Sequence, residues 1–146
     1  MRPKKDVQND VQCGFEMVKA RDIDRFGVQG VIDRLKKRVG DTKVYISVDI
    51  DVLDPAFAPA TGTAEVGGWS TRELLSILDG LEGLEVVGAD VGICNVLASM
   101  RRQADSALVE VAPIYDGQGE PTVLAAAEVA LSLIGLMVKK PAHASA

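Results

Sequence analysis

Asp49 and Asp51 close a run of strand-forming residues, Lys43 to Asp51, that reads KVYISVDID. The run is rich in β-branched and aromatic side chains and has little polar alternation before its end, which predicts a buried parallel strand. Because side chains two residues apart in a strand lie on the same face, both carboxylates are expected to point into one site. In open α/β sheets, ligands bind at this carboxyl end of the strands.

Two carboxylates that converge in a half-buried site repel each other unless a cation neutralises them. A hard divalent metal ion is the simplest such cation. The alternative is that one or both aspartates cap the loop that follows, as Asp residues at strand ends often do. The spacing alone leaves both interpretations open.

Two other kinds of acidic site can be compared with this segment. An EF-hand calcium loop that began at Asp49 would need glycine at Asp54 and glutamate at Ala60, and the segment has neither. A phosphotransferase of the haloacid dehalogenase type also carries Asp-x-Asp after a strand, but Leu53 departs from its pattern. Neither alternative fits the segment well.

The segment 47–65 reads SVDIDVLDPAFAPATGTAE. It closely resembles the signature of the ureohydrolase (arginase and agmatinase) family, which runs Ser-x-Asp-x-Asp-x-x-Asp-Pro and then Pro-x-Thr-Gly-Thr. The likeness continues through Gly67-Gly68, Thr71 to Leu74 and, after an interruption, Val109 to Pro113. It covers nearly the whole chain, and it looks more like agmatinases and guanidinobutyrases than arginases.

The resemblance implies a three-layer α/β fold, in which helices flank a parallel sheet, with this chain as the C-terminal half of the domain. It implies manganese as the cofactor of the complete protein, where Asp49 and Asp51 match the second pair of metal-binding aspartates. Glu110 matches the glutamate that pairs with the substrate guanidinium through parallel N–H bonds. Thr63 matches a loop threonine that supports this pocket, whereas Glu65 is interpreted as an exposed loop residue.

The implied reaction is hydrolysis of a linear amidine, agmatine or guanidinobutyrate, to urea and an amine. A metal ion that lowers the pKa of bound water supplies the hydroxide for such a reaction. The implied partners are a small guanidino substrate and, in the complete protein, further copies of the chain in a homo-oligomer. No residue of this chain is assigned a catalytic role.

Two departures from the family pattern limit these expectations. The motifs Gly-Gly-Asp-His and Asp-Ala-His-x-Asp, which carry the family's remaining metal ligands and a catalytic histidine, do not occur in the sequence. In addition, residues 92–108 interrupt a segment that is continuous in family members, and we interpret them as a non-family insertion, such as a translated intron. We therefore expect the chain alone to be inactive, since two carboxylates cannot hold two dications. The rival interpretation is a non-catalytic remnant that folds partly, or that binds intact subunits through the family's oligomer contacts.

The elements that would position the site alternate between strand and helix, which predicts a parallel α/β sheet. Ser70 and Glu73 form a capping box that opens a helix reaching Leu81. The residues between Leu53 and Gly68 are expected to form an ordered loop. Apolar spacing predicts the remaining elements, which are a helix from Asp22 to Val39, a buried strand from Leu84 to Val91, and an Ala-rich helix from Pro121 to Lys140.

Composition excludes several classes of protein. A net charge of -5 provides no basic field for nucleic acid or an anionic membrane. The most apolar run, Val123 to Val138, is interrupted by Glu128 and is shorter than the ~20 residues of a bilayer span, so it predicts a buried helix. Cys13, Cys94 and His143 are too far apart in sequence to indicate a zinc site. No targeting signal is found in the chain, which leaves the cytoplasm and the mitochondrion open as locations.

Overall fold

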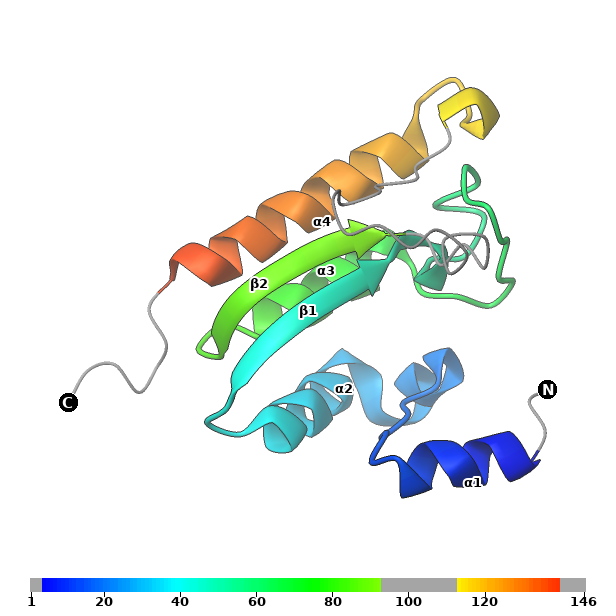
Figure 1. The fold of residues 1–146 in the computed structure, drawn as a ribbon. Coiled ribbons are helices and arrows are strands. Elements are labelled where there is room, and N and C mark those ends of the chain that lie inside the picture. The colour runs from blue at the N-terminus through cyan, green and yellow to red at the C-terminus, as the bar shows by residue number, and fades with distance from the viewer. Residues whose placement is uncertain (1–3, 93–112, 140–146) are drawn as a thin grey trace, which may run out of the picture.

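The computed structural model describes residues 4–92 and 113–139 (Figure 1). The helices and strands are α1 (Lys4–Gln12), α2 (Ile23–Val39), β1 (Lys43–Asp49), α3 (Thr71–Gly80), β2 (Glu85–Gly92) and α4 (Pro121–Val138). Short 3-10 turns occur at Ala20–Asp22, Ile50–Val52 and Pro113–Tyr115. Glu110 and all of the predicted insertion except Gly92 lie outside these residues, so the insertion remains a prediction.

β1 and β2 form a parallel sheet of two strands within the described ranges, as the alternation of elements predicts. Lys43 lies opposite Glu85 and Asp49 opposite Gly92, so both strands end at the same edge. The register shifts between Val44 and Tyr45. Asp49, at the end of β1, therefore lies next to the end of β2.

The core lies between the sheet and two helices. In Figure 1, α3 lies behind the sheet and α4 runs along β2, while α2 lies beyond β1. The main cluster joins residues of both strands to α3, α4 and the loop after β1, with Ile50, Leu53 and Val129 among its most buried members. A smaller cluster of Val31, Ile32 and Ile77 joins α2 to α3.

Helix ends follow the sequence signals closely. The helix predicted from Asp22 to Val39 is confirmed as α2, although Gly27 adopts φ 66° and breaks its regular geometry. The capping box of α3 is also confirmed, because the Ser70 hydroxyl accepts from the Glu73 N–H at 3.2 Å and the Ser70 N–H donates to Glu73 Oε2 at 2.7 Å. Both signals are local, which is why they can be recognised in the sequence.

The strand predicted for Lys43 to Asp51 is wrong at its end. β1 stops at Asp49, and Ile50–Val52 form a 3-10 turn that the N–H of Leu53 closes by donating to the carbonyl of Ile50 at 3.2 Å. Ile50 and Leu53 are both fully buried, and both belong to the main core cluster. In an extended strand, side chains three residues apart point to opposite faces, so the turn lets both of them enter the same cluster.

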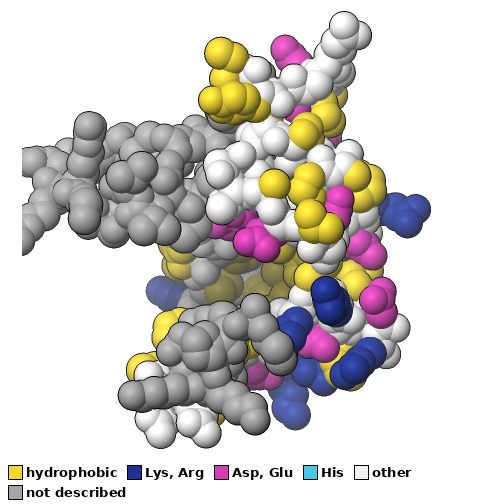
Figure 2. Space-filling view, turned by 90° about the vertical axis from the view of Figure 1, so that its right-hand side faces the viewer, with side chains coloured by type: hydrophobic (Ala, Val, Ile, Leu, Met, Phe, Trp, Pro, Cys, Tyr) yellow, Lys and Arg dark blue, Asp and Glu magenta, His cyan; other side chains and the backbone are white. Residues whose placement is uncertain are grey.

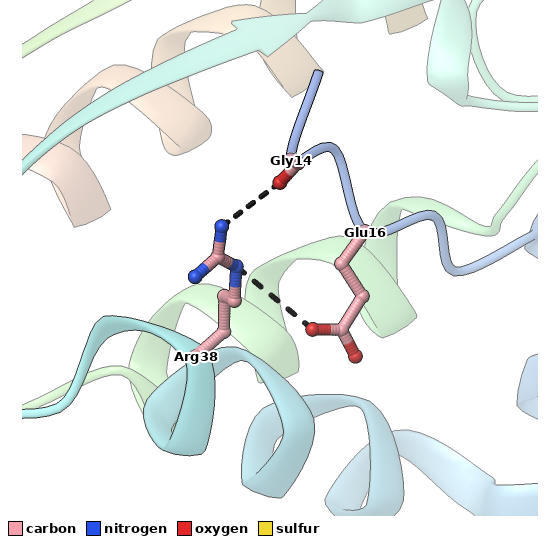
Figure 3. Close-up of polar contacts among 3 residues, drawn as sticks. All are labelled: Gly14, Glu16 and Arg38. Atoms are coloured by element: carbon pink, nitrogen blue, oxygen red, sulfur yellow. Dashed lines mark hydrogen bonds and ion pairs between the residues drawn. The ribbon is translucent and has the colours of Figure 1, made fainter. Parts of the chain in front are cut away.

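Arg38 of α2 makes two polar contacts with the N-terminal segment, in addition to the packing of Val18 near Val31 and Ile32. Arg38 donates a hydrogen bond to the carbonyl of Gly14 at 2.9 Å and forms an ion pair with Glu16 at 3.9 Å (Figure 3). All of these groups are exposed, so the ion pair contributes little to stability.

α4 is the one helix in the described ranges that is long and apolar enough, by length and composition, to cross a membrane. It nevertheless packs as a core helix, because Ala125, Ala126, Val129 and Leu133 are buried against the sheet and α3. This confirms the helix predicted from the apolar run, which begins at Pro121 as expected. Its opposite face is exposed.

Candidate functional site

The edge where the strands end borders a cavity of about 790 Å³. Asp49 and Asp51 both line it, together with Glu65 from the loop and Lys19 and Arg21 from the N-terminal segment. Figure 2 views this side of the molecule and shows a hollow with hydrophobic and acidic side chains at its border. The two aspartates therefore share one site, although Asp51 reaches it from the 3-10 turn and not from β1.

Thr63 lies against one of these aspartates. Its Oγ1 donates a hydrogen bond to Asp51 Oδ2 at 3.0 Å, and its carbonyl accepts one from Thr61 Oγ1 at 2.9 Å. A bond from a neutral hydroxyl fixes a carboxylate in one orientation without removing its charge. The structure thus places Thr63 beside the predicted metal ligand, while Glu110 lies outside the described residues.

Asp54 closes the loop that carries this threonine. It accepts hydrogen bonds from the backbone N–H groups of Ala56 at 2.9 Å and Gly67 at 2.8 Å. The Ala56 bond and then the Gly67 bond lower the pKa of Asp54, against a small opposing effect of burial. Asp54 therefore closes this loop, and its position before Pro55 is a turn signal that could have revealed it. Asp51 also accepts a bond from the loop, so both interpretations of the aspartate pair remain predictions.

Trp69 joins three segments around the cavity. Its backbone pairs with that of Val52 and Asp54, with both hydrogen bonds at 2.9 Å, and its Nε1 donates to the carbonyl of Ala20 at 3.3 Å. Gly68 makes this pairing possible, since a Cβ there would lie 2.5 Å from the carbonyl oxygen of Val52. Gly68 thus has a steric reason, whereas Gly67 has a conformational one, because its φ is 86° and a Cβ there would meet no atom within 4 Å.

Asp116 caps the start of α4, and Thr122 connects this cap to the loop after β1. Its carboxylate accepts from the backbone N–H groups of Gly117, Thr122 and Val123 and from the Thr122 hydroxyl, at 2.9–3.2 Å. Burial raises the pKa of Asp116, but these bonds together outweigh it and lower the pKa. The Thr122 hydroxyl in turn accepts from the N–H of Ala60, a buried bond of 3.0 Å. Sequence reasoning missed this cap because Asp116 precedes Thr122 by more than the usual capping distance.

Asp90 organises the face of the sheet next to Asp49. Its Oδ1 and Oδ2 accept hydrogen bonds from the Ser47 and Tyr45 hydroxyls, each at 2.7 Å. The bond to Asp90 is the main reason that the pKa of Tyr45 is raised, with burial and the negative charge of Asp90 adding to it. Gly88 leaves room for the Tyr45 ring, whose Cδ2 would lie 2.7 Å from a Cβ there. The cluster of Tyr45, Ser47 and Asp90 can be recognised only when the register of β1 and β2 is known.

The carboxylate oxygens at this edge are of the type that manganese prefers, but there are too few of them for a complete metal site. Asp49 and Asp51 offer hard carboxylate oxygens, which suit this ion. Within residues 4–92 and 113–139, however, no group of three or more His, Cys, Asp or Glu side chains is placed to hold a metal ion. The described residues therefore do not form a complete metal centre, and the role of Asp49 and Asp51 as metal ligands remains a prediction.

The fold and this edge define an α/β domain with a parallel sheet whose strand ends carry an acidic site. The model of the arginase family matches residues 2–103. The chain therefore belongs to the arginase family.

Named relatives agree with this assignment. The chain is 50% identical over 136 residues to "Putative agmatinase 3" of Schizosaccharomyces pombe, covering 93% of this chain and 29% of that protein. It is 41% identical over 127 residues to an agmatinase of Photorhabdus laumondii, covering 87% of this chain and 36% of that protein. The chain thus spans about a third of the length of these relatives.

Solved structures confirm the arginase-like α/β fold. A crystal structure of a hypothetical agmatinase from Burkholderia thailandensis matches with a TM-score of 0.71 and 39% identity, over 88% of this chain and 35% of that one. Proclavaminate amidino hydrolase from Streptomyces clavuligerus matches with a TM-score of 0.74 and 36% identity, over 90% of this chain and 38% of that one.

Proposed function

We propose that this chain is part of a ureohydrolase that hydrolyses a small linear guanidino compound, agmatine or guanidinobutyrate, to urea and an amine. The observation that carries the proposal is the convergence of Asp49 and Asp51 on one cavity, with Thr63 bonded to Asp51. Relatives that are 41% and 50% identical to this chain are named as agmatinases, which supports the choice of substrate class. The activity is a proposal for the complete protein.

Manganese is the proposed cofactor of that complete protein. Asp49 and Asp51 would contribute oxygen ligands, and the remaining ligands would come from elsewhere in the protein. A metal ion held there would lower the pKa of a bound water molecule and would so supply hydroxide near neutral pH.

The chain's own residues prepare the site in three ways. Thr63 holds the Asp51 carboxylate in one orientation, which reduces the reorganisation needed when a ligand arrives. Asp54 and Gly68 keep the loop folded over the end of β1. Glu110 is proposed to pair with the substrate guanidinium, because a carboxylate can accept two parallel N–H bonds from it.

Urea release tests the proposed activity. The complete protein, loaded with manganese and given agmatine or guanidinobutyrate, should release urea. Asp51→Asn should lower kcat/KM by about 100-fold or more, since even residues that only support metal ligands cost 10- to 100-fold. The matched control is Asp33→Asn on the exposed side of α2, where the carboxylate accepts a bond from Gln29. Absence of urea with both substrates would contradict the proposal.

The same assay tests the expectation for the chain by itself. The purified 146-residue chain should release no urea with manganese and either substrate, because its described residues lack a full set of ligands. Circular dichroism should show that it is folded in the same buffer. Manganese-dependent urea release from the folded chain would contradict this expectation and leave the family assignment intact.

A further inference from the structure

A buried hydrogen bond ties the loop after β1 to the start of α4. The backbone N–H of Ala60 donates to the Thr122 hydroxyl at 3.0 Å, and both residues are fully buried. The other hydrogen bonds that residues 55–66 make with described residues lead to Asp51, Asp54 or Thr63, which belong to the same segment. Apolar packing also holds the loop, but it is not directional as a hydrogen bond is. Thr122 therefore anchors the loop from outside.

Asp116 decides how the Thr122 hydroxyl is oriented. A hydroxyl has one proton to donate and two lone pairs with which it accepts. Thr122 donates its proton to Asp116 Oδ1 at 2.9 Å, which leaves a lone pair for the N–H of Ala60. The backbone N–H groups of Gly117 and Val123 hold the Asp116 carboxylate in turn. The acceptor that Ala60 meets is therefore fixed in orientation.

The loop connects this anchor to the candidate site through three residues. The Thr61 hydroxyl donates to the Thr63 carbonyl at 2.9 Å, which keeps the loop tightly turned between Ala60 and Thr63. Thr63 Oγ1 then donates to Asp51 Oδ2 at 3.0 Å. Because three residues span at most about 11 Å, a shift of Ala60 is passed on to Thr63. The position of Thr63 therefore depends on a bond made by α4.

We propose that Thr122, oriented by Asp116, is a positioning residue for the candidate site, because it holds the loop where Thr63 can orient the Asp51 carboxylate. The proposal rests on the proposed function, which gives Asp51 its role. No residue of α4 is among the described residues that line the cavity at this edge, so Thr122 acts only through the loop. Partners of metal ligands change metal affinity by about 10- to 100-fold, and we expect the lower end for a residue one contact further away.

The manganese affinity of the complete protein tests this effect. Thr122→Val keeps the shape of the side chain but removes the acceptor, and it should weaken manganese binding by about tenfold. The electron paramagnetic resonance of free Mn²⁺ measures the affinity. Thr122→Ser restores the hydroxyl and should restore the natural affinity. Leu136→Val is the matched control, because it loosens the buried packing of α4 far from the loop and should leave the affinity unchanged.

A double-mutant cycle shows whether the effect runs through Thr63. Thr63→Val removes the bond to Asp51, so the addition of Thr122→Val should weaken manganese binding no further. A general loss of stability would instead lower the affinity by the same factor in both backgrounds. The cycle thus separates positioning from destabilisation.

A signal from Thr63 itself provides a readout that needs neither metal nor activity. In the complete protein with isotope-labelled threonine methyl groups, the Thr63 resonance can be assigned because Thr63→Val removes it. This resonance should shift in Thr122→Val and stay in place in Leu136→Val. If Thr122→Val does not fold, Thr122→Cys replaces it, because sulfur is only a weak acceptor.

Three results would overturn the proposal. The first is a Thr63 resonance that the loss of the Thr122 hydroxyl leaves unchanged. The second is an equal loss of manganese affinity in Thr122→Val and in either Thr122→Ser or Leu136→Val. The third is a cycle in which the effects of the Thr63 and Thr122 variants multiply. A complete protein that releases no urea contradicts the proposed function instead, and the Thr63 resonance still decides whether Thr122 positions the loop.

Discussion

Thr122, at the start of α4, accepts a hydrogen bond from the backbone N–H of Ala60, 62 residues earlier in the chain, at 3.0 Å. Both residues are fully buried, and the same hydroxyl donates to Asp116 at 2.9 Å. One side chain thus joins the loop after β1 to the cap of α4. Loss of this hydroxyl should therefore affect both elements.

Thr122→Val tests this connection. The substitution keeps the shape of the side chain but leaves the buried N–H of Ala60 without its acceptor, which costs about 1–3 kcal/mol. Urea denaturation should show a lower free energy of unfolding by this amount. Thr122→Ser keeps the hydroxyl and is the control, so an equal loss in both variants would refute a role for the hydrogen bond.

Gly68→Ala should disturb the site through a steric clash. The added Cβ would lie 2.5 Å from the carbonyl oxygen of Val52 and 2.6 Å from the backbone nitrogen of Asp54, and backbone atoms cannot move aside cheaply. We expect a loss of about 1–3 kcal/mol in the free energy of unfolding, typical of overpacking. Gly119→Ala, where a Cβ meets no atom within 4 Å, should be close to neutral in the same denaturation experiment. Equal stabilities of the two variants would contradict the predicted clash.

Asp90→Ala should lower the pKa of Tyr45 toward that of an ordinary tyrosine. The hydrogen bond to Asp90 is the first cause of the raised pKa, and its loss makes the phenolate easier to form. An ultraviolet absorbance titration in a Tyr115→Phe background follows Tyr45 alone, because the chain has two tyrosines. Ser47→Ala keeps the bond from Tyr45 to Asp90 and should leave the pKa raised. A Tyr45 pKa that is the same with and without Asp90 would rule out the proposed cause.

Asp54 and Asp116 should make the fold sensitive to acid. Their pKa values are lowered in the folded state, so their contribution to stability is present above the pKa of an unfolded Asp, about 3.9, and is lost as the pH falls through the folded values. The difference in unfolding free energy between the natural chain and Asp54→Asn should therefore be largest near neutral pH and shrink as the pH falls from about 5 to about 3. Denaturation at several pH values measures it. A difference that stays constant over this range would be inconsistent with the lowered pKa.

Local signals in the sequence predict most of the elements and the acidic motif. The capping box at Ser70 and Glu73 needs only neighbouring residues, and so does the carboxylate pair of Asp49 and Asp51. The turn at Ile50–Val52 was missed because it depends on how Ile50 packs in the core. A run of residues with high β propensity does not show that packing. The pattern of β-branched and aromatic residues therefore predicted where β1 begins, but not where it ends.

Contacts between distant segments account for the rest of what was missed. Asp90 becomes important only when the register places it opposite Ser47. Lys19 and Arg21 line the cavity because Trp69 binds the carbonyl of Ala20, and no pattern in the sequence marks that pair. The role of Glu110 and the nature of residues 92–108 stay predictions.

Trp69 is the one tryptophan of the chain, and it lies where the N-terminal segment, the loop after β1 and the start of α3 meet. The protein therefore carries its own optical reporter at the wall of the candidate site. Separation of the loop from Ala20 would expose the indole to water and change its emission. Fluorescence of the unlabelled chain can consequently follow the assembly of this wall separately from the global unfolding seen by circular dichroism.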